Sequence, residues 1–592
     1  MRLPFLLLFL ISIQLHAQRV ACHSHNDYVH PVPFWMAYSA GAKSIEADVF
    51  LVNDDLVVAH TAREIEATKT FRKLYLEPIN GLLSNSFDSF DELQLLVDVK
   101  TEPQTTLNKI IQEFNQFPLI LRKIQESNHK FRIVISGNRP KDYGNYPDFI
   151  LFDHQQLEDL EKINLAKVGL VSFSFQKFSK WNGKGRIIDA EMKVLQDVIK
   201  KVHSLAKPVR FWATPDSKTT WFSLAQMGVD FVNTDNPFGC ISYLNSLDSN
   251  LVAVDFGQIP QNTLPKVKSS PQNIILMIGD GNGLAQISAG YLANGQRLNM
   301  ARIKNVGFIS TQSADDFTTD SAAGGTALAT GKKTKNRYVG LDPSGQTLNN
   351  IFEILNTQKG YNTGIVTTDE LTGATPASFY GHTNDRGNIQ DLKKDFLKSS
   401  VNVFASGGSA RFDSLDWVKN ERKMLKSIGE IGSANGNRIG CMEATKDMPY
   451  ITQKRGDFLP QATQQTLDYL TKKKKPFMLI VENSHIDNAG HDNFAQGVVS
   501  EEIDFDQAIG VAMRYVDLHP KTLLVITADH ETGGVTIPHG TKNQMELQFH
   551  SDDHSGILVP IFAYGRGADL FSGIDDNTSV FKKILHLLKI KE

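Results

Sequence analysis

Five short apolar runs in the second half of the chain limit what it can fold into more than any other feature. Each run has the length and composition of a strand buried on both faces, and helical lengths of sequence separate the runs, which is typical of a mostly parallel sheet covered by helices. Acids and histidines cluster beside these runs, and open α/β sheets bind their ligands at the carboxyl ends of their strands. We therefore expect an α/β domain with a polar site, built on strands at Asn273–Ile278, Gly364–Thr367, Phe477–Val481, Leu523–Thr527 and Leu558–Phe562.

A second series of β-rich runs lies between residues 19 and 245. These runs alternate with longer amphipathic stretches, which suggests βαβ units around a parallel sheet, either open or closed into a barrel. The runs are Ala42–Leu51, Leu93–Val99, Phe131–Ser136, Lys167–Phe173 and Val209–Ala213.

Residues 247–270 read as a linker, because this stretch is rich in Ser, Asn, Pro and Gln without clear periodicity. A chain of 592 residues also exceeds the size of one ordinary hydrophobic core. We expect one domain over 18–246 and another over 271–592, in which 388–470 is a candidate peripheral insertion.

The first 17 residues are predicted to be a signal peptide that is removed. Arg2 gives a positive start, Leu3 to Leu15 is apolar, and Ala17 is a small residue suited to cleavage. The apolar stretch is shorter than the roughly 20 residues that span a bilayer. We expect a secreted or periplasmic protein with no transmembrane segment after signal removal.

Composition excludes two classes of partner or site. The chain carries 62 basic and 65 acidic residues, a formal net charge of −3, which gives no overall field favouring nucleic acid. Its three cysteines, Cys22, Cys240 and Cys441, lie far apart and form no metal-binding pattern. No disulfide is predicted with them.

Ser321 is the candidate nucleophile of the second half. The segment Thr319-Asp320-Ser321 carries helix-capping residues, and small helix formers follow it. Ser321 would then lie at a helix N-terminus, where the dipole and free N–H groups favour phosphate, although a plain helix cap is the simpler interpretation. A serine hydroxyl needs a base or a metal for activation, and this segment has no histidine, so a metal would have to activate it.

Metal-ligand types occur in clusters beside the predicted strands. Asp487 and His491 are spaced i, i+4 and share one face of a helical turn. Mixed carboxylates and imidazoles suit zinc, whereas oxygen ligands alone suit magnesium. The candidates are Asp280, Glu482, Asp487, His491, Asp529, His530 and His554.

The order of these motifs resembles the alkaline phosphatase family over about 271–590. The motifs are a strand followed by Asp280-Gly-Asn-Gly, then Asp320-Ser-Ala, Ala374-Thr-Pro-Ala, Val481-Glu-Asn-Ser-His-Ile-Asp-Asn-Ala-Gly-His, Ala528-Asp-His and His554-Ser-Gly. The resemblance implies an α/β/α sandwich that hydrolyses phosphate monoesters with two Zn²⁺ and one Mg²⁺. It implies one zinc on Asp487, His491 and His554, a second on Asp280, Asp529 and His530, and magnesium on Asp280, Thr375 and Glu482.

The same resemblance implies a double in-line displacement. Ser321 would carry the phosphoryl group as an intermediate, and Arg386 would bind phosphate oxygens with its guanidinium fork. One position departs from the family pattern: Gly373 stands where members commonly have Asp or His. The expected magnesium site therefore loses an outer group.

The first half contains acids on its predicted strands. Glu46 and Asp48 are spaced i, i+2 and point to the same face of one strand, a geometry for joint cation binding. Asp98 lies on another otherwise buried strand, where an acid is costly unless it is paired or bound to metal. A structural ion-pair set with Lys100 is the alternative interpretation.

Three histidines, His23, His25 and His60, accompany these acids. Two histidines flanking a carboxylate-bound cation suit phosphodiester cleavage, one as base and one as acid. The region resembles the glycerophosphodiester phosphodiesterase and phosphatidylinositol phospholipase C superfamily, which implies a TIM-type β/α barrel. By that resemblance Glu46, Asp48 and Asp98 would hold Ca²⁺ or Mg²⁺. His23-Ser-His25 replaces the usual His-Arg-Gly opening, so the catalytic histidine is open between the two; His23 is favoured because it directly follows the strand, with His60 as its partner.

Together these features predict a two-enzyme chain that scavenges phosphate outside the cytoplasm. Its substrates would be small phosphodiesters and phosphate monoesters, and it is a candidate homodimer. The alternative is that the first domain only binds a phospholipid or phosphodiester and localises the phosphatase.

Overall fold

The computed structural model describes residues 20–85, 92–127, 130–250, 264, 269–540 and 543–591. The predicted signal peptide over 1–17 and most of the predicted linker lie outside the described residues. The chain divides into two compact units at residues 254 and 255, within the predicted linker. Among the described helices, none is long and apolar enough to cross a membrane.

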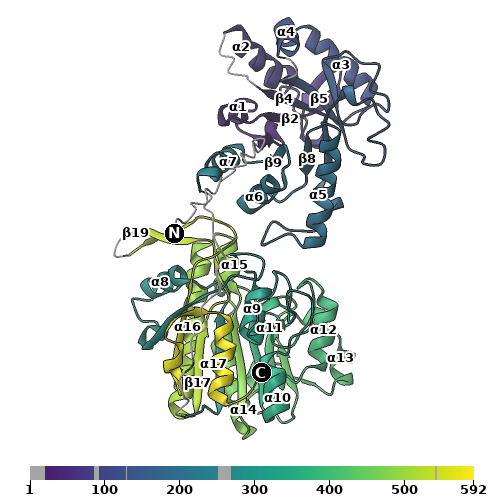
Figure 1. Ribbon diagram of the computed structural model, residues 1–592. Helices are drawn as coiled ribbons and strands as arrows, with labels where there is room; N and C mark the ends of the chain where they lie inside the picture. The colour runs from purple at the N-terminus through teal and green to yellow at the C-terminus, as the bar shows by residue number, and fades with distance from the viewer. Residues whose placement is uncertain are drawn as a thin grey trace, which may run out of the picture. The chain divides into compact units, whose positions relative to one another are not determined.

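The first unit is a ring of eight parallel strands with one added hairpin strand, β3 (Figure 1). The ring closes because β1 pairs with both β9 and β2. The predicted barrel is therefore confirmed in place of an open sheet. Its strands are β1 (Ala21–Ser24), β2 (Ser44–Val52), β3 (Asp55–Val58), β4 (Leu93–Val99), β5 (Phe131–Gly137), β6 (Ile150–His154), β7 (Val168–Ser174), β8 (Val209–Trp212) and β9 (Phe231–Thr234).

Helices follow most of the barrel strands. No α-helix lies between β5 and β6 in the fully described stretch 130–250, where Pro140, Gly144 and Pro147 disfavour one. The α-helices are α1 (Trp35–Ala40), α2 (Glu77–Ser84), α3 (Pro103–Asn115), α4 (Pro118–Glu126), α5 (Asp189–Ser204), α6 (Lys218–Met227) and α7 (Pro237–Asn250).

The second unit is built on a ten-stranded mixed sheet whose central strands β12, β16, β10 and β17 are parallel. All five predicted runs match strands of this sheet, and only Leu558 lies outside, one residue before β22. In spatial order its strands are β14 (Lys423–Met424), β15 (Ile439–Met442), β13 (Val403–Gly407), β12 (Asn362–Glu370), β16 (Phe477–Asn483), β10 (Asn273–Gly279), β17 (Thr522–Thr527), β22 (Val559–Gly565), β11 (Asn305–Ser310) and β23 (Gly573–Asp576).

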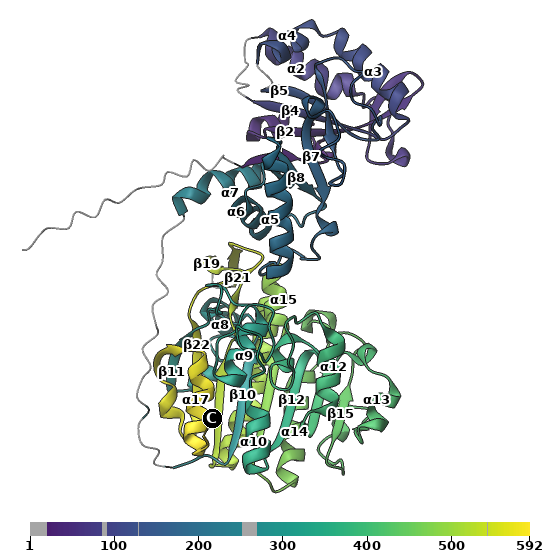
Figure 2. The same ribbon diagram turned by 45° about the vertical axis from the view of Figure 1, so that its right-hand side comes forward.

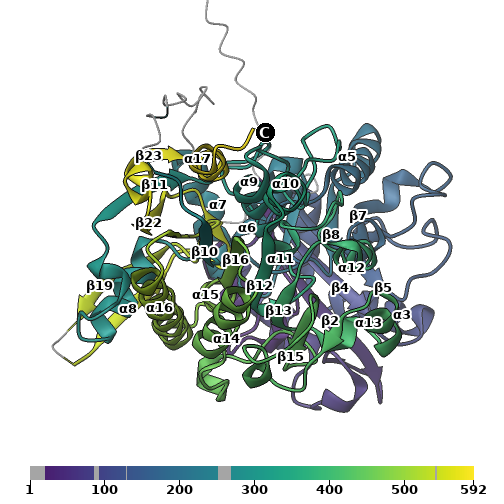
Figure 3. The ribbon, with the colours of Figure 1, turned by 90° about the horizontal axis from the view of Figure 1, so that it is seen from below.

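Helices cover both faces of this sheet. Figure 2 shows α9 (Ser321–Thr330), α10 (Ile351–Lys359) and α17 (Thr578–Leu588) over one face, and Figure 3 shows α14 (Phe458–Lys472) and α16 (Ala495–Leu518) on the other. The alternation of β10 explains this, since Leu276 packs in the core with α9 and Met277 packs in the core with α16. Burying each such side chain contributes about 1.5–3 kcal/mol.

Residues 388–470 extend the central sheet at one edge. β13 pairs with β12, and β15 and β14 follow it outward. The segment also includes α12 (Ile389–Lys398) and α13 (Ser414–Lys419). It is therefore continuous with the sheet.

The remaining elements lie around the carboxyl ends of the central strands. They are α8 (Leu284–Ala293), α11 (Ala374–Ala377), α15 (His485–His491), the pair β18 (Glu531–Thr532) and β21 (His554–Ser555), and the hairpin β19 (Val535–Gly540) and β20 (Met545–Phe549).

Candidate active sites

Ser321 is the first residue of the buried helix α9. The preceding Asp320 caps the helix, because its Oδ1 accepts a hydrogen bond from the Ala323 N–H at 2.9 Å. The Ser321 Oγ lies 3.3 Å from Nε2 of His530 and 3.4 Å from Nη1 of Arg386. A helix N-terminus and a guanidinium thus meet at this hydroxyl, an arrangement suited to a phosphate group.

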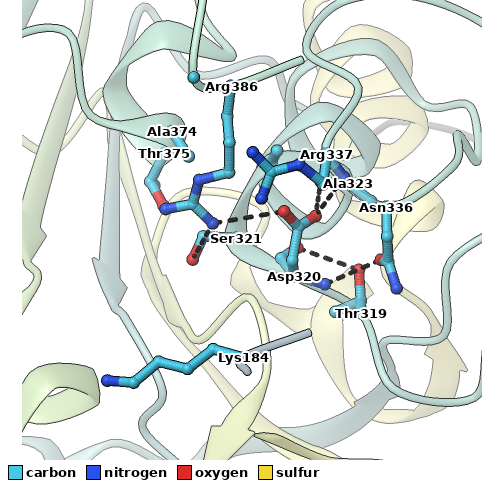
Figure 4. A network of polar contacts seen from close by, with 12 residues as sticks. Lys184, Thr319, Asp320, Ser321, Ala323, Asn336, Arg337, Ala374, Thr375 and Arg386 are labelled. Atoms are coloured by element: carbon cyan, nitrogen blue, oxygen red, sulfur yellow. Dashed lines mark hydrogen bonds and ion pairs between the residues drawn. The ribbon is translucent and has the colours of Figure 1, made fainter. Parts of the chain in front are cut away.

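Arg386 points at the start of α9, as Figure 4 shows. Its Nη1 also donates to Asp320 Oδ2 at 3.3 Å. Burial alone would lower the pKa of Arg386, but the charge of Asp320 and other nearby acids outweighs it and raises that pKa. The neighbouring Arg337 instead forms two bonds with Asp385, at 2.7 and 3.1 Å. Only Arg386 of these two is placed to bind a group on Ser321.

A pair of histidines faces Asp487. His491 Nδ1 bonds to the Asp552 carbonyl at 2.6 Å, and His554 Nδ1 bonds to the Thr319 carbonyl at 2.7 Å. Because a carbonyl only accepts, each Nδ1 carries the hydrogen and each Nε2 turns a lone pair inward. The two Nε2 atoms are 3.1 Å apart, and each is 3.5 Å from a carboxylate oxygen of Asp487. A cation can be held between such groups, and this donor set matches zinc.

His530 forms a second group with two aspartates. Its Nε2 is 3.3 Å from Asp280 Oδ1 and 3.3 Å from Asp529 Oδ2. Both oxygens are buried without a hydrogen-bond partner among the described residues. Burial, followed by the charge of Asp529, raises the pKa of Asp280 well above its usual range. Acids held in this way favour a bound cation, and the donor set again matches zinc.

A third group contains oxygen atoms alone. Thr375 Oγ1 donates to Asp280 Oδ2 at 3.2 Å. Glu482 is 1% exposed, its Oε2 accepts from Thr367, and its Oε1 has no hydrogen-bond partner among the described residues. Burial, followed by the charge of Asp369, raises the pKa of Glu482. Hard oxygen donors of this kind fit Mg²⁺.

The structure gathers all ten candidates of the second half into one site at the carboxyl ends of β10, β12, β16 and β17. Sequence reasoning missed Asp369. Asp369 follows a predicted strand in the same way as Asp280. The expectation that ligands bind at the carboxyl ends of strands could therefore have selected it.

The first unit has a cavity of about 400 Å³ at the carboxyl ends of its barrel strands. Glu46, Asp48 and Asp98 line it, with one carboxylate oxygen from each lying within 4.8 Å of the others. Lys100 Nζ lies 2.8 Å from Asp48 Oδ2, and Arg210 Nη1 lies 2.9 Å from Glu46 Oε2. The site therefore combines acids with built-in cations.

Cation binding remains compatible with these ion pairs. Asp48 Oδ1 and Asp98 Oδ1 are buried without a hydrogen-bond partner among the described residues, although Lys100 Nζ lies 3.3 Å from Asp98 Oδ1. Gly137 leaves room for the Asp98 carboxylate, because a Cβ at position 137 would lie only 2.0 Å from Asp98 Oδ1. These carboxylate oxygens are ligands of the kind that Ca²⁺ or Mg²⁺ takes.

The structure places His25 and His60 at this cavity, whereas His23 does not line it. His23 is fully buried in β1, with Nδ1 at 2.7 Å from Ser44 Oγ and Nε2 at 2.7 Å from Glu46 Oε2. Burial and the nearby Arg210 charge lower its pKa to about 3. His23 thus contacts Glu46, which lines the cavity, without lining it itself, and the choice between His23 and His25 stays a prediction.

His25 lies just beyond β1 and bonds to a carboxylate that sequence reasoning did not select. Its Nδ1 is 2.8 Å from Oδ1 of Asp235. Burial would lower the pKa of His25, but the Asp235 bond and nearby acid charges raise it. His60, whose side chain is 55% exposed, has its Nδ1 3.4 Å from Asp48 Oδ2. A histidine held by a carboxylate is an arrangement typical of general bases.

Models of three families match the chain. The alkaline phosphatase model matches residues 271–404 and 408–548. An AIM6-like phosphodiesterase domain matches residues 12–123, and the glycerophosphoryl diester phosphodiesterase family matches residues 208–237. Both halves therefore match families of phosphate ester hydrolases.

Relatives agree with the larger match. Alkaline phosphatase 4 of Bacillus subtilis is 33% identical over 419 residues, which cover 54% of this chain and 90% of the relative. The structure of alkaline phosphatase from the Antarctic bacterium TAB5 is 34% identical with a TM-score of 0.52, and the match covers 55% of this chain and 99% of that one. A variant of the TAB5 enzyme has Mg bound in its M3 site. By this similarity the chain belongs to the alkaline phosphatase family.

Proposed function

We propose that the second unit hydrolyses phosphate monoesters through a phosphoserine on Ser321, and that the first unit hydrolyses phosphodiesters. The observation that carries the first activity is the convergence of Arg386 and His530 on the Ser321 hydroxyl, at 3.4 and 3.3 Å. The observation that favours the second is the cavity shared by His25, His60 and three acids.

Three cations fit the donor groups of the second unit. The proposed sets are Asp487, His491 and His554 for one Zn²⁺, Asp280, Asp529 and His530 for another, and Asp280, Thr375 and Glu482 for Mg²⁺. When bound, these ions supply positive charge that lowers the pKa of the serine hydroxyl and stabilises charge on the phosphoryl group.

The chain's own residues carry out two displacements at phosphorus. Ser321 loses its hydroxyl proton to solvent, and its Oγ forms a bond to phosphorus. The bond from phosphorus to the ester oxygen breaks, and the leaving oxygen takes a proton from water and departs as the alcohol. Arg386 binds two phosphoryl oxygens and holds the group in line with Ser321. Water then attacks phosphorus, the bond to Ser321 Oγ breaks, and inorganic phosphate leaves.

In the first unit, His25 is proposed as the base and His60 as the acid. Asp235 orients His25 and stabilises its charged form when it takes a proton from the attacking water. His60 donates a proton to the leaving oxygen. Glu46, Asp48 and Asp98 would hold Ca²⁺ or Mg²⁺, whose charge offsets that of the phosphodiester.

The two reactions form a natural order. Cleavage of a phosphodiester gives a phosphate monoester, which is the substrate class of the second unit. An extracytoplasmic protein of this kind would scavenge phosphate, and the predicted signal peptide supports that location. The other candidate role for the first unit is non-catalytic binding of a phosphodiester or phospholipid.

The test uses the purified chain with a chromogenic phosphate monoester and its diester, with Zn²⁺, Mg²⁺ and Ca²⁺ varied. Ser321→Ala should abolish monoester turnover and leave diester cleavage, whereas His25→Ala should do the reverse. Each variant is the control for the other. Monoester turnover that survives Ser321→Ala would refute the phosphoserine, and diester cleavage untouched by both His25→Ala and His60→Ala would favour the binding role.

A further inference from the structure

Gly373 is required by a neighbouring carboxylate and not by its own backbone. Its φ is −59°, a value open to any residue. A Cβ at this position would lie 1.7 Å from Asp369 Oδ2 and 2.5 Å from Asp369 Cγ. Real Cβ atoms do not approach other atoms this closely. The Asp369 carboxylate therefore occupies the space that a side chain at position 373 would fill.

Asp369 is tied to the oxygen-only group through one hydroxyl. Its N–H donates to Thr367 Oγ1 at 2.8 Å, and that hydroxyl donates to Glu482. Its own Oδ1 accepts from the Glu370 N–H at 2.6 Å, which fixes the carboxylate at the end of β12. Among neighbouring charges, that of Asp369 acts most strongly on Glu482.

The oxygen-only group has a second feature that points to a bound cation. Glu482 is 1% exposed, and its Oε1 has no hydrogen bond from any described residue. A buried carboxylate oxygen without a donor is costly unless a cation binds it. Asp369 adds a further negative charge that acts on Glu482, which raises the need for a divalent cation.

We propose that Asp369 supplies the acid of this third cation site, in place of a side chain at position 373. The acid then comes from the end of β12, four residues before position 373 at the start of α11. Gly373 is needed for this arrangement, because only a residue without a Cβ leaves room for the Asp369 carboxylate. Asp369 acts as a positioning residue for Mg²⁺ held by Glu482 and Thr375, and the inference rests on the proposed function.

The test measures Mg²⁺ binding in variants that remove the carboxylate of position 369 or place one at position 373. Mg²⁺ is titrated calorimetrically into the zinc-loaded full chain, and zinc content is measured by elemental analysis. Asp369→Asn keeps the acceptor for the Glu370 N–H but removes the charge, and it should weaken Mg²⁺ binding about tenfold or more with zinc content unchanged. Asp369→Ala should do the same. Glu370→Gln is the matched control, because Glu370 pairs with Arg411 at 2.6 Å, and it should bind Mg²⁺ normally.

A double variant tests whether an acid at position 373 can replace Asp369. Gly373→Asp alone should weaken Mg²⁺ binding, since two carboxylates then compete for one space. Asp369→Ala with Gly373→Asp should restore binding to within about threefold of the unaltered protein, because the acid returns from the other position. The proposal is overturned if Asp369→Asn and Asp369→Ala bind Mg²⁺ like the unaltered chain, if the double variant binds no better than Asp369→Ala, or if the unaltered chain binds no Mg²⁺. Loss of monoester turnover does not enter this readout, so the proposed phosphatase could fail while the cation site stands.

Discussion

The two sites solve the burial of acids in different ways. In the first unit, Glu46 and Asp48 already contact the cations Arg210 and Lys100, although one oxygen each of Asp48 and Asp98 has no hydrogen-bond partner among the described residues. In the second unit, Asp280, Asp529 and Glu482 keep buried oxygens without hydrogen-bond partners among the described residues. We therefore expect the second site to depend more on added cations for its stability, whereas the first carries part of its neutralising charge within the chain.

Metal removal should separate the units most strongly. A chelator should abolish monoester turnover and lower the unfolding free energy of the second unit by several kcal/mol, since one site held at a thousandfold excess over Kd contributes about 4 kcal/mol. The unfolding of the first unit should shift less. Differential scanning calorimetry with and without chelator measures both transitions. Equal shifts of the two unfolding transitions would contradict a greater dependence of the second unit on cations.

Replacing His25 tests whether the first unit is an enzyme. His25→Ala should reduce diester cleavage about 10²–10⁴-fold, because a general acid or base is lost. His203→Ala is a matched control, since His203 makes a similar 2.8 Å pair with Asp230 away from the cavity lining. Steady-state kinetics on both variants gives the answer. Equal diester cleavage in the two variants would favour a non-catalytic binding role for the cavity.

Arg386 provides a smaller test within the second unit. Arg386→Ala should lower kcat/KM for monoesters about 10²-fold through loss of the bonds to the transferred group. Arg337→Ala removes an arginine of the same region that is bonded to Asp385 instead, and its effect should stay within a few-fold. If both variants lose activity alike, general charge in the region matters more than the fork of Arg386.

Strand positions followed from the sequence because most of these strands are buried on both faces. The predicted run Leu93–Val99 coincides with β4 from end to end. β6, at Ile150–His154, was missed because it is short and no helix separates it from β5. Apolar runs reveal a buried strand, whereas a short strand that ends in Asp153 and His154 has little such signal.

The candidate sites were less evenly predictable. Ligand types at strand ends located the second site because parallel strands bring their carboxyl ends to one edge. The choice between His23 and His25 was harder, since the two residues are spaced i, i+2 and strand alternation places both on the same side of the barrel wall. Its partner Asp235 lies 210 residues away, and only the closed ring brings the pair together.

The smallest expected effect concerns the His25 and Asp235 pair. Asp235 raises the pKa of His25 against the lowering effect of burial. Asp235→Asn should therefore lower that pKa, and a base that must be deprotonated then stays active at lower pH. The acidic limb of the diester pH–rate profile should shift to lower pH, with a modest fall in the maximal rate from poorer orientation.

The matched variant for this profile is Asp230→Asn, which removes a carboxylate from another histidine, His203, and should leave the acidic limb in place. A shift toward higher pH in Asp235→Asn would contradict a general base at His25, because it would require a group that becomes harder to deprotonate when the neighbouring negative charge is lost. A shift of the expected sign would sharpen the contrast between the sites. The first unit would then adjust its reactive group with a carboxylate of its own chain, whereas the second is proposed to activate Ser321 through cations that the chain only holds.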